Sequence, residues 1–190
     1  ATTTGTQDVK RIQDGDVCLN ELEHRRYRRS VGRLQWICPL RPDICYAVKE
    51  LSKGSAHPTR EDQARLKHLL RYLKGTLHYI FVLAVKVALA GLTLEIICHC
   101  DSDWAGDLRT RKSTSGFLLS IFGCCFHFGS RTQAVHAMSS GEAELYAIGT
   151  AVSETLHVKS FLQELKLFKT LKILVYTDST AGKSMATRFG

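Results

Sequence analysis

The hydrophobic pattern of this chain changes its period near residue 77, and this change limits the folds that are open to it. Before it, apolar residues recur at helical spacing, as Tyr27, Val31 and Leu34 do within residues 22–37. After it, short apolar runs alternate with breaks that contain Gly or acidic residues. We therefore expect helices first and strands afterwards.

Further helices are expected between Pro42 and Gly54 and between Thr59 and Gly75, because these residue types favour helix starts and ends. Residues 1–20 are polar and aperiodic, which predicts a flexible linker. The chain does not begin with Met, so we expect it to be a piece of a longer protein.

The second part predicts strands, a long helix, another strand and a short helix. The expected strands are "LHYIFVLAV" (77–85), "LTLEIICHC", "SGFLLSIFG", "CCFHFGS" and "LKILVYT", and the long helix is "SSGEAELYAIGTAVSETLHVKSFLQEL". Antiparallel strands followed by a crossover to one more strand imply a mixed sheet with helices packed on it. The expected fold class is therefore α/β, with an N-terminal helical segment.

The net charge of +8 is spread unevenly along the chain. Residues 1–90 carry 16 Lys and Arg against 9 Asp and Glu, whereas residues 91–190 carry 10 against 9. A basic half beside a neutral half suggests a surface that binds a polyanion. The alternative is a solvated cationic surface without a partner.

The seven cysteines include no CxxC pair, which disfavours a zinc site. Free thiols are typical of a reducing compartment, so we expect the protein in the cytoplasm. The longest apolar run is interrupted by Lys86 and is too short to span a bilayer, so no membrane association is expected.

Two acidic residues, Asp101 and Asp178, follow directly after expected strands. Catalytic and ligand-binding groups favour the carboxyl ends of strands in such sheets. The alternative for a single Asp at this place is a turn former or a helix cap.

Two glutamates near the start of the long helix can be separated by geometry. At about 100° per residue, Glu144 lies in the middle of the apolar face, whereas Glu142 lies about 160° away on the solvent side. A carboxylate that faces a core costs several kcal/mol unless charges or hydrogen bonds compensate it. Three carboxylates that converge there would suit two Mg²⁺ or Mn²⁺ ions, which could hydrolyse a phosphodiester.

Three blocks of the second half resemble the ribonuclease H domain of copia-type LTR retrotransposon Pol polyproteins. They read "DSDWAGDLRTRKSTSG", "SSGEAELYA" and "VYTDSTAG". Upstream, "YRRSVGRLQWICPLRPDICYAVKELSKGSAHPTREDQARLKHLLRYLKGT" is similar to the thumb or connection region of reverse transcriptase in the same polyproteins. The resemblance covers about residues 24–190.

This resemblance implies a ribonuclease H-like fold with a five-stranded mixed sheet, which cuts the RNA strand of RNA–DNA hybrids with two Mg²⁺ or Mn²⁺ ions. Together with the polar linker at residues 1–20, it implies a division into a thumb or connection segment (21–76) and a ribonuclease H-like domain (77–190) that is truncated at its C-terminus. The expected partners are the hybrid and the rest of the polyprotein.

Carried over by position, the resemblance implies that Asp101, Glu144 and Asp178 are the catalytic and metal-binding residues. Asp103 is the rival to Asp101, because residues two apart on a strand share a face. The helical geometry selects Glu144 independently of the family.

The basic residues are assigned to the phosphate backbone, as the resemblance to thumb and connection regions implies. Arg25 and Arg29 belong to the densest cluster, and Arg111, Lys112 and Ser113 follow the first acidic block. Such contacts depend on salt and ignore sequence. The alternatives are a solvated helix surface for the arginines and a turn for "TRKST".

Several features depart from the family pattern. The chain reaches Gly190 before the part that carries the family's fourth acidic residue or His, and it has no YxDD-type polymerase motif. Gly141 replaces a polar residue, and Phe128 stands where Trp is common. The alternative function is thus a catalytically incomplete or decayed remnant that only binds nucleic acid or supports another domain. An integrase-like DNA nuclease on the same fold is a third possibility.

Overall fold

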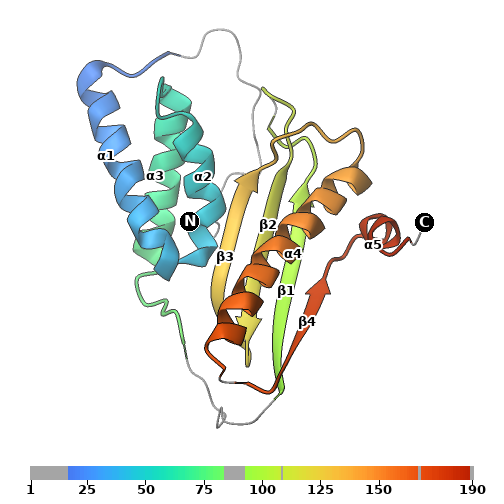
Figure 1. Ribbon diagram of the computed structural model, residues 1–190. Coiled ribbons are helices and arrows are strands. Elements are labelled where there is room, and N and C mark those ends of the chain that lie inside the picture. The colour runs from blue at the N-terminus through green and yellow to red at the C-terminus, as the bar shows by residue number, and fades with distance from the viewer. Residues whose placement is uncertain (1–16, 84–92, 108, 167, 189–190) are drawn as a thin grey trace. The chain divides into compact units, whose positions relative to one another are not determined.

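The computed structural model describes residues 17–83, 93–107, 109–166 and 168–188 (Figure 1). The chain divides into two compact units, Ala1–Phe81 and Val82–Gly190. The described residues form five α-helices and one mixed four-stranded sheet, so the expected mixed α/β class is confirmed.

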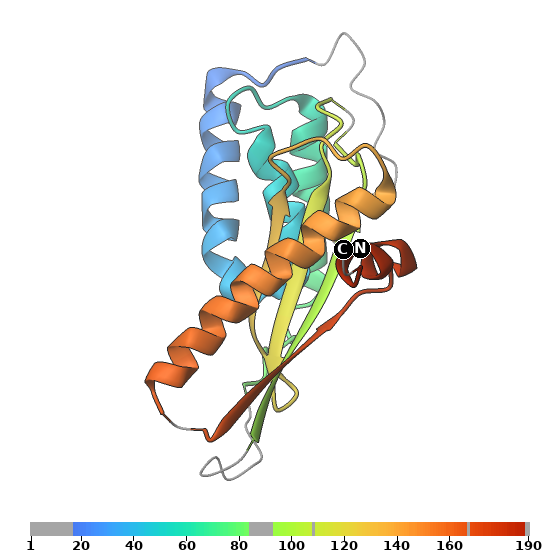
Figure 2. The ribbon, with the colours of Figure 1, turned by 45° about the vertical axis from the view of Figure 1, so that its right-hand side comes forward.

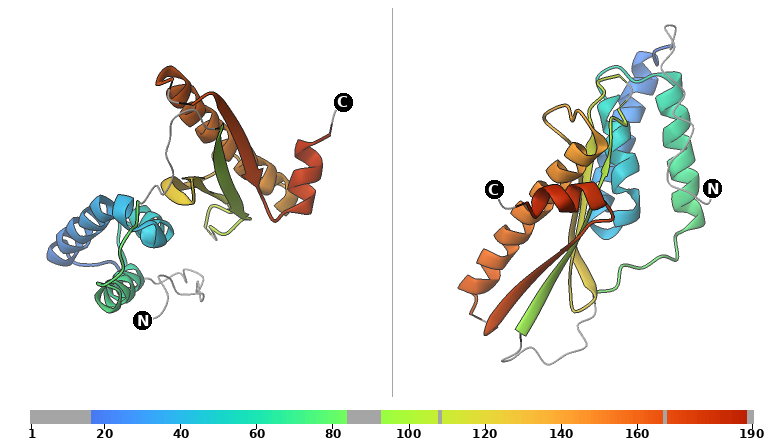
Figure 3. Two further views of the ribbon diagram at one scale, coloured as in Figure 1. Left: turned by 90° about the horizontal axis from the view of Figure 1, so that it is seen from below. Right: turned by 90° about the vertical axis from the view of Figure 1, so that its right-hand side faces the viewer.

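The first unit is helical, as the periodicity predicts. Its elements are α1 (Glu21–Ile37), the 3₁₀ turns η1 (Cys38–Leu40) and η2 (Pro42–Ile44), α2 (Cys45–Lys53) and α3 (Arg60–Gly75). Asn20 and Thr59 cap α1 and α3 through capping boxes with Glu23 and Asp62. The left view of Figure 3 shows these three helices nearly end-on.

One hydrophobic core joins the three helices. Tyr27, Val31 and Leu34 of α1 are buried at the predicted spacing. Other members of the core are Ile44, Val48, Leu51, Leu66, Leu69 and Tyr72. The Tyr27 hydroxyl donates a hydrogen bond of 2.6 Å to the Leu51 carbonyl, which fixes α1 against the end of α2.

The linker was expected to cover residues 1–20, but its last four residues are part of the folded helical unit. Cys18 forms an isolated antiparallel bridge with Thr59, and the Leu19 amide donates to the Pro58 carbonyl at 2.9 Å. Leu19 is also part of the core. Residues 17–20 therefore belong to the helical unit, and residues 1–16 lie outside the described part of the chain.

The second unit contains the sheet. Its elements are β1 (Thr93–Asp103), β2 (Thr114–Ile121), β3 (Cys124–Thr132), α4 (Ser140–Glu164), β4 (Thr170–Tyr176) and α5 (Thr180–Ala186). The strand order is β3-β2-β1-β4, with β1–β2 and β2–β3 antiparallel and β1–β4 parallel. Phe122 and Gly123, both with positive φ, make the predicted hairpin turn between β2 and β3.

Helix α4 lies across one face of the sheet (Figure 2). Its buried positions Ala143, Ala147, Ala151 and Thr155 are small and recur every four residues. Small side chains let the helix axis approach the strands closely. The apolar partners on the sheet include Ile96, Cys98, Phe117 and Leu119.

The prediction of a strand at residues 77–85 is wrong for residues 77–83, which the structure describes. Residues 77–83 form a turn and irregular chain, while residues 84 and 85 lie outside the described residues. A run that favours strands needs a neighbouring strand to pair with, and here the Tyr79 amide instead donates to the Thr76 carbonyl at 3.1 Å. The described part of the chain has four strands, rather than the five that the family resemblance implies.

Candidate metal centre

Two of the three predicted carboxylates owe their proximity to the parallel pairing of β1 with β4. In this register His99 lies opposite Tyr176, and an aspartate stands two residues after each of them. Asp101 lies within β1, which runs on to Asp103 instead of ending before Asp101 as expected, and Asp178 lies just beyond the end of β4. Asp101 and Asp178 therefore reach the same level at the carboxyl ends of neighbouring strands. Both are exposed.

The third carboxylate, Glu144, comes from the first turns of α4. Ser139 caps this helix by accepting a hydrogen bond from the Glu142 amide at 3.2 Å. Glu144 lies between the buried Ala143 and Ala147 in sequence, and its side chain is directed toward the ends of the strands. One carboxylate oxygen from each of Asp101, Glu144 and Asp178 lies within 4.8 Å of the others.

The electrostatics of this cluster are unfavourable without a cation. Burial raises the pKa of Glu144, and the charges of Asp101 and Asp178 raise it further, while the neighbouring Ser102 side chain acts in the opposite direction. Oε2 of Glu144 is shielded from solvent and has no hydrogen-bond partner of good geometry among the described residues. A buried oxygen without a partner in a set of oxygen donors fits a hard divalent cation.

Helix α5 packs directly behind Glu144. A Cβ atom at Gly182 would lie 2.9 Å from the Cβ of Glu144 and 3.3 Å from Cδ1 of Ile148. Gly182 thus lets α5 approach α4 closely, as the right view of Figure 3 shows. This contact restricts the Glu144 side chain, and sequence reasoning did not identify it.

Glu142 has the structural place that the helical geometry predicts. Its carboxylate accepts hydrogen bonds from the Met138 amide at 2.7 Å and from the Tyr146 hydroxyl at 3.0 Å. It therefore extends the N-terminal cap of α4 and is not a member of the cluster. The rival Asp103 is outside the cluster as well and lies against Gly106, where a Cβ would be 1.9 Å from its Oδ2.

The side chain of Trp104, which sequence reasoning did not identify, connects β1 to the segment before α4. Trp104 follows β1 and donates from Nε1 to the Ala137 carbonyl at 3.2 Å. Ala137 precedes Met138, whose amide is held by Glu142. These contacts link the strand of Asp101 to the helix of Glu144, and only the tertiary structure reveals them.

The basic residues after β1 have different environments. Arg111 is exposed, and its backbone has a φ of 55°. Lys112 donates from Nζ to the Ala134 carbonyl at 2.8 Å. Ser113 is fully buried, and its hydroxyl accepts a hydrogen bond from the Ala105 amide at 3.0 Å. A phosphate has no access to this hydroxyl, so we remove Ser113 from the expected contacts.

The predicted arginines of α1 are exposed, and one of them lies on an open depression. Arg25 pairs with Glu21, four residues earlier on the helix. Arg29 lines the depression together with Gly32, Arg33, Gln35, Trp36 and Pro39. Within residues 17–83, neither Arg29 nor Arg33 has an ion pair, and Trp36 is 87% exposed. Helical spacing aligns these three side chains, so the pattern could have revealed Trp36 as well.

Comparison with known proteins places this chain among transposon proteins. The retrovirus-related Pol polyprotein from transposon RE1 of Arabidopsis thaliana is 37% identical over 154 residues, which cover 80% of this chain and 10% of that protein. The corresponding polyprotein from transposon TNT 1-94 of Nicotiana tabacum is 34% identical over 155 residues, 80% of this chain and 11% of that protein. The chain belongs to the copia-type retrotransposon Pol polyproteins.

The chain spans about a tenth of the length of these copia-type Pol polyproteins. A smaller relative, secreted RxLR effector protein 161 of Plasmopara viticola, is 35% identical over 131 residues, 68% of this chain and 89% of that relative. Neither a family model nor a solved structure matches the chain. Among the described residues, no helix combines the length and apolar character needed to cross a membrane.

One departure from the copia-type pattern has a structural counterpart. Gly141, where the family resemblance implied a polar residue, is buried where α4 meets α5. A Cβ there would lie 3.1 Å from Cε of Met185 and 3.2 Å from Cβ of Ala181. A larger residue would require these neighbours to move by a few tenths of an ångström.

Proposed function

We propose that this Pol fragment is a ribonuclease H-type endonuclease that cuts the RNA strand of RNA–DNA hybrids within a reverse transcriptase polyprotein. The observation that carries the proposal is the convergence of Asp101, Glu144 and Asp178 within 4.8 Å. Membership in the copia-type Pol family supports it, because the three blocks that resemble the ribonuclease H domain of that family contain these residues.

The donor set supports a site for two Mg²⁺ or Mn²⁺ ions. Three carboxylates supply only oxygen ligands, which hard cations prefer. Such ions would activate a water molecule and stabilise the leaving oxygen of a phosphodiester. Asp101 and Asp178 are exposed and leave the site open to a substrate, whereas Glu144 is held from behind by Gly182.

The remaining basic residues are proposed to hold the phosphate backbone of the hybrid. This role was expected from the sequence for Arg25, Arg29, Arg111 and Lys112. The structure adds Arg33 and Trp36, which line the same depression as Arg29; these three residues are called the α1 surface below. The arginines would supply a salt-dependent contact, and the exposed indole would supply an apolar one. We place the protein in a reducing cellular interior, which suits its free cysteines.

The decisive experiment compares two glutamate variants on the same substrate. The chain is incubated with a labelled RNA–DNA hybrid and Mg²⁺ or Mn²⁺, and the RNA products are resolved by electrophoresis. We expect cleavage by the wild type and by Glu142→Gln, and at least about a hundredfold slower cleavage by Glu144→Gln, because catalysis through bound ions requires its ligands.

Other outcomes would contradict the proposal in different ways. Activity that survives in Glu144→Gln but is lost in Glu142→Gln would reject the assigned site. Binding of the hybrid without cleavage, in either metal, would favour the non-catalytic remnant. Equal cleavage of duplex DNA would favour the integrase-like alternative.

A further inference from the structure

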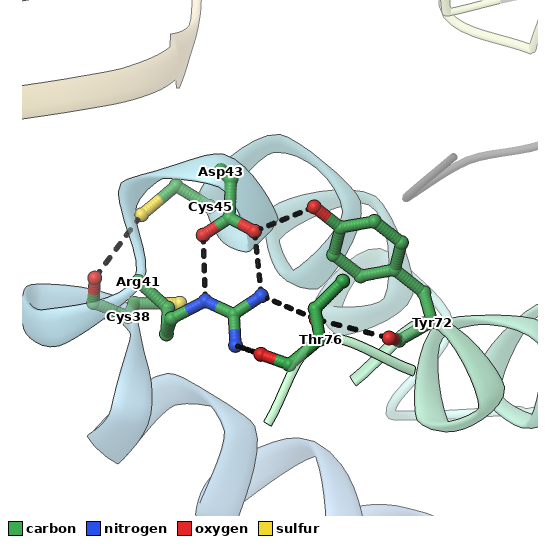
Figure 4. Close-up of polar contacts among 6 residues, drawn as sticks. All are labelled: Cys38, Arg41, Asp43, Cys45, Tyr72 and Thr76. Carbon is green, nitrogen blue, oxygen red and sulfur yellow. Dashed lines mark hydrogen bonds and ion pairs between the residues drawn. The ribbon is translucent and has the colours of Figure 1, made fainter. Parts of the chain in front are cut away.

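Two free thiols flank the loop between α1 and α2 (Figure 4). Cys38 begins η1, and Cys45 begins α2. Sγ of Cys45 donates to the Cys38 carbonyl at 3.8 Å, so the Cys45 thiol is directed toward Cys38. Both residues are partly buried, so a small reagent can reach them.

A polar network holds this loop in place. Arg41 binds Asp43 through two hydrogen bonds, from Nε at 2.9 Å and from Nη2 at 2.7 Å. The Tyr72 hydroxyl donates to Asp43 at 2.8 Å, and Arg41 donates to the carbonyl and the hydroxyl of Thr76 at 3.2 and 2.8 Å. The loop is therefore anchored to the C-terminal end of α3, and this network holds the backbone between the two cysteines.

The two sulfur atoms differ in their chemistry. The hydrogen bond between them raises the pKa of Cys38 and lowers that of Cys45, so the thiolate forms first at Cys45. The thiolate is the reactive form of cysteine. In contrast, burial raises the pKa of Cys98, and it raises the pKa of Cys100 to about 11. These two sheet cysteines therefore provide an internal comparison.

We propose that Cys38 and Cys45 form an oxidisable dithiol that reacts with peroxides. The Cys45 thiolate attacks one oxygen of hydrogen peroxide, the O–O bond breaks, and a sulfenic acid and hydroxide form. The Cys38 thiol then attacks the sulfenic sulfur, and its proton leaves with the hydroxyl group as water. Overall, two thiols and one hydrogen peroxide give one disulfide and two water molecules.

The disulfide would close a ring that contains Arg41 and Asp43 and would join the end of α1 to the start of α2. One of its cysteines, Cys38, follows Trp36 of the α1 surface by two residues in the sequence. The proposed dithiol chemistry does not depend on the proposed nuclease activity. In a reducing compartment such a bond is transient and acts as a redox switch.

Peptide mapping can test this pair directly. Trypsin does not cleave the Arg41–Pro42 bond, so residues 34–49 form one peptide that contains both thiols. After hydrogen peroxide treatment and alkylation, we expect this peptide to be lighter by two hydrogen atoms than the dithiol form and to resist alkylation. The peptide of residues 87–109, which contains Cys98 and Cys100, should still alkylate at the same peroxide concentration.

Single substitutions assign the two roles. With Cys38→Ser, we expect Cys45 to stop at the sulfenic acid, which dimedone traps. With Cys45→Ser, we expect Cys38 to oxidise at least about tenfold more slowly than Cys45 does, because burial and the charge of Asp43 still raise the pKa of its thiol when Cys45 is absent. Full alkylation of residues 34–49 after peroxide treatment would overturn the proposal, and so would disulfides that form only between molecules.

Discussion

At the scale of single residues, Glu144 is a carboxylate in surroundings that disfavour its ionised form. Its pKa is raised by burial and by two neighbouring aspartates, and Oε2 has no partner among the described residues. Glu142, on the same helix, has two hydrogen-bond donors. A glutamate therefore stabilises the start of α4 at position 142, whereas at position 144 its ionised form is destabilised.

Replacing Glu144 by Gln should stabilise the metal-free protein by about 1–2 kcal/mol at pH 7. Because the folded state raises the pKa above its ordinary value of 4.5, ionisation favours the unfolded state at higher pH. The gain should disappear below about pH 4.5, where the carboxyl is protonated in both states. Denaturant unfolding between pH 4 and 8 measures this dependence.

Metal ions should make the wild type more stable to unfolding than Glu144→Gln. Mn²⁺ at millimolar concentration should raise the free energy of unfolding of the wild type but not that of Glu144→Gln, because a ligand stabilises only the state that binds it. A metal-free Glu144→Gln variant that is less stable than the wild type at pH 7 would disprove the argument about its charge.

At the scale of secondary-structure elements, a pair of contacts attaches α4 to the edge strand β3. Glu154 accepts hydrogen bonds from His127 at 3.0 Å and from Arg131 at 2.6 Å. These contacts, with the His127 bond as the largest cause, hold the pKa of Glu154 below its ordinary value. The middle of α4 is therefore tied to β3 by charge as well as by packing against the sheet.

The Glu154→Gln substitution should lower the free energy of unfolding by about 1 kcal/mol at pH 7. Because the folded-state pKa is depressed, this contribution is present above the ordinary pKa of 4.5 and is lost as the pH falls through the folded-state value. Unfolding curves at pH 3 and pH 7 check both signs. A double-mutant cycle with Arg131→Ala isolates that pair, and a coupling energy of zero at pH 7 would refute it.

At the scale of the whole molecule, two hydrophobic cores serve two compact units. The helical core contains Leu69, which is 1% exposed, and the sheet core contains Leu119, which is fully buried. The two tryptophans are divided as well, because Trp36 lies in the first unit and Trp104 in the second. Each unit therefore contains one tryptophan.

Core truncations should act on one unit at a time. Leu69→Ala should cost about 2–5 kcal/mol in the helical unit and leave the sheet unit nearly unchanged, whereas Leu119→Ala should do the reverse. Trp104→Phe and Trp36→Phe backgrounds leave a single fluorophore to follow each transition during denaturation. Equal shifts of both transitions by either leucine substitution would show that the units unfold as one.

Local patterns explain how much of this protein could be predicted. Helix caps such as Thr59 and helical spacing of apolar residues operate over a few positions, so the helices of the first unit followed from the sequence. The cap at Asn20 did not, because it lies in the segment expected to be a linker. The turn at Gly123 and the side of α4 on which Glu144 lies also followed from the sequence. Each depends on backbone geometry within one or two turns of chain.

The tertiary structure decided everything that depends on contacts between distant segments. The sequence chose Asp101 over Asp103 only through the family resemblance, whereas the structure separates the two residues by the register of β1 against β4 and by the position of Glu144. The sequence did not show that Ser113 is enclosed or that residues 77–83 lack a strand partner. The sequence by itself determined the helices, four of the five expected strands and the residues that could do chemistry. Only long-range packing determined which of those residues meet, because burial and register are properties of segments far apart in the chain.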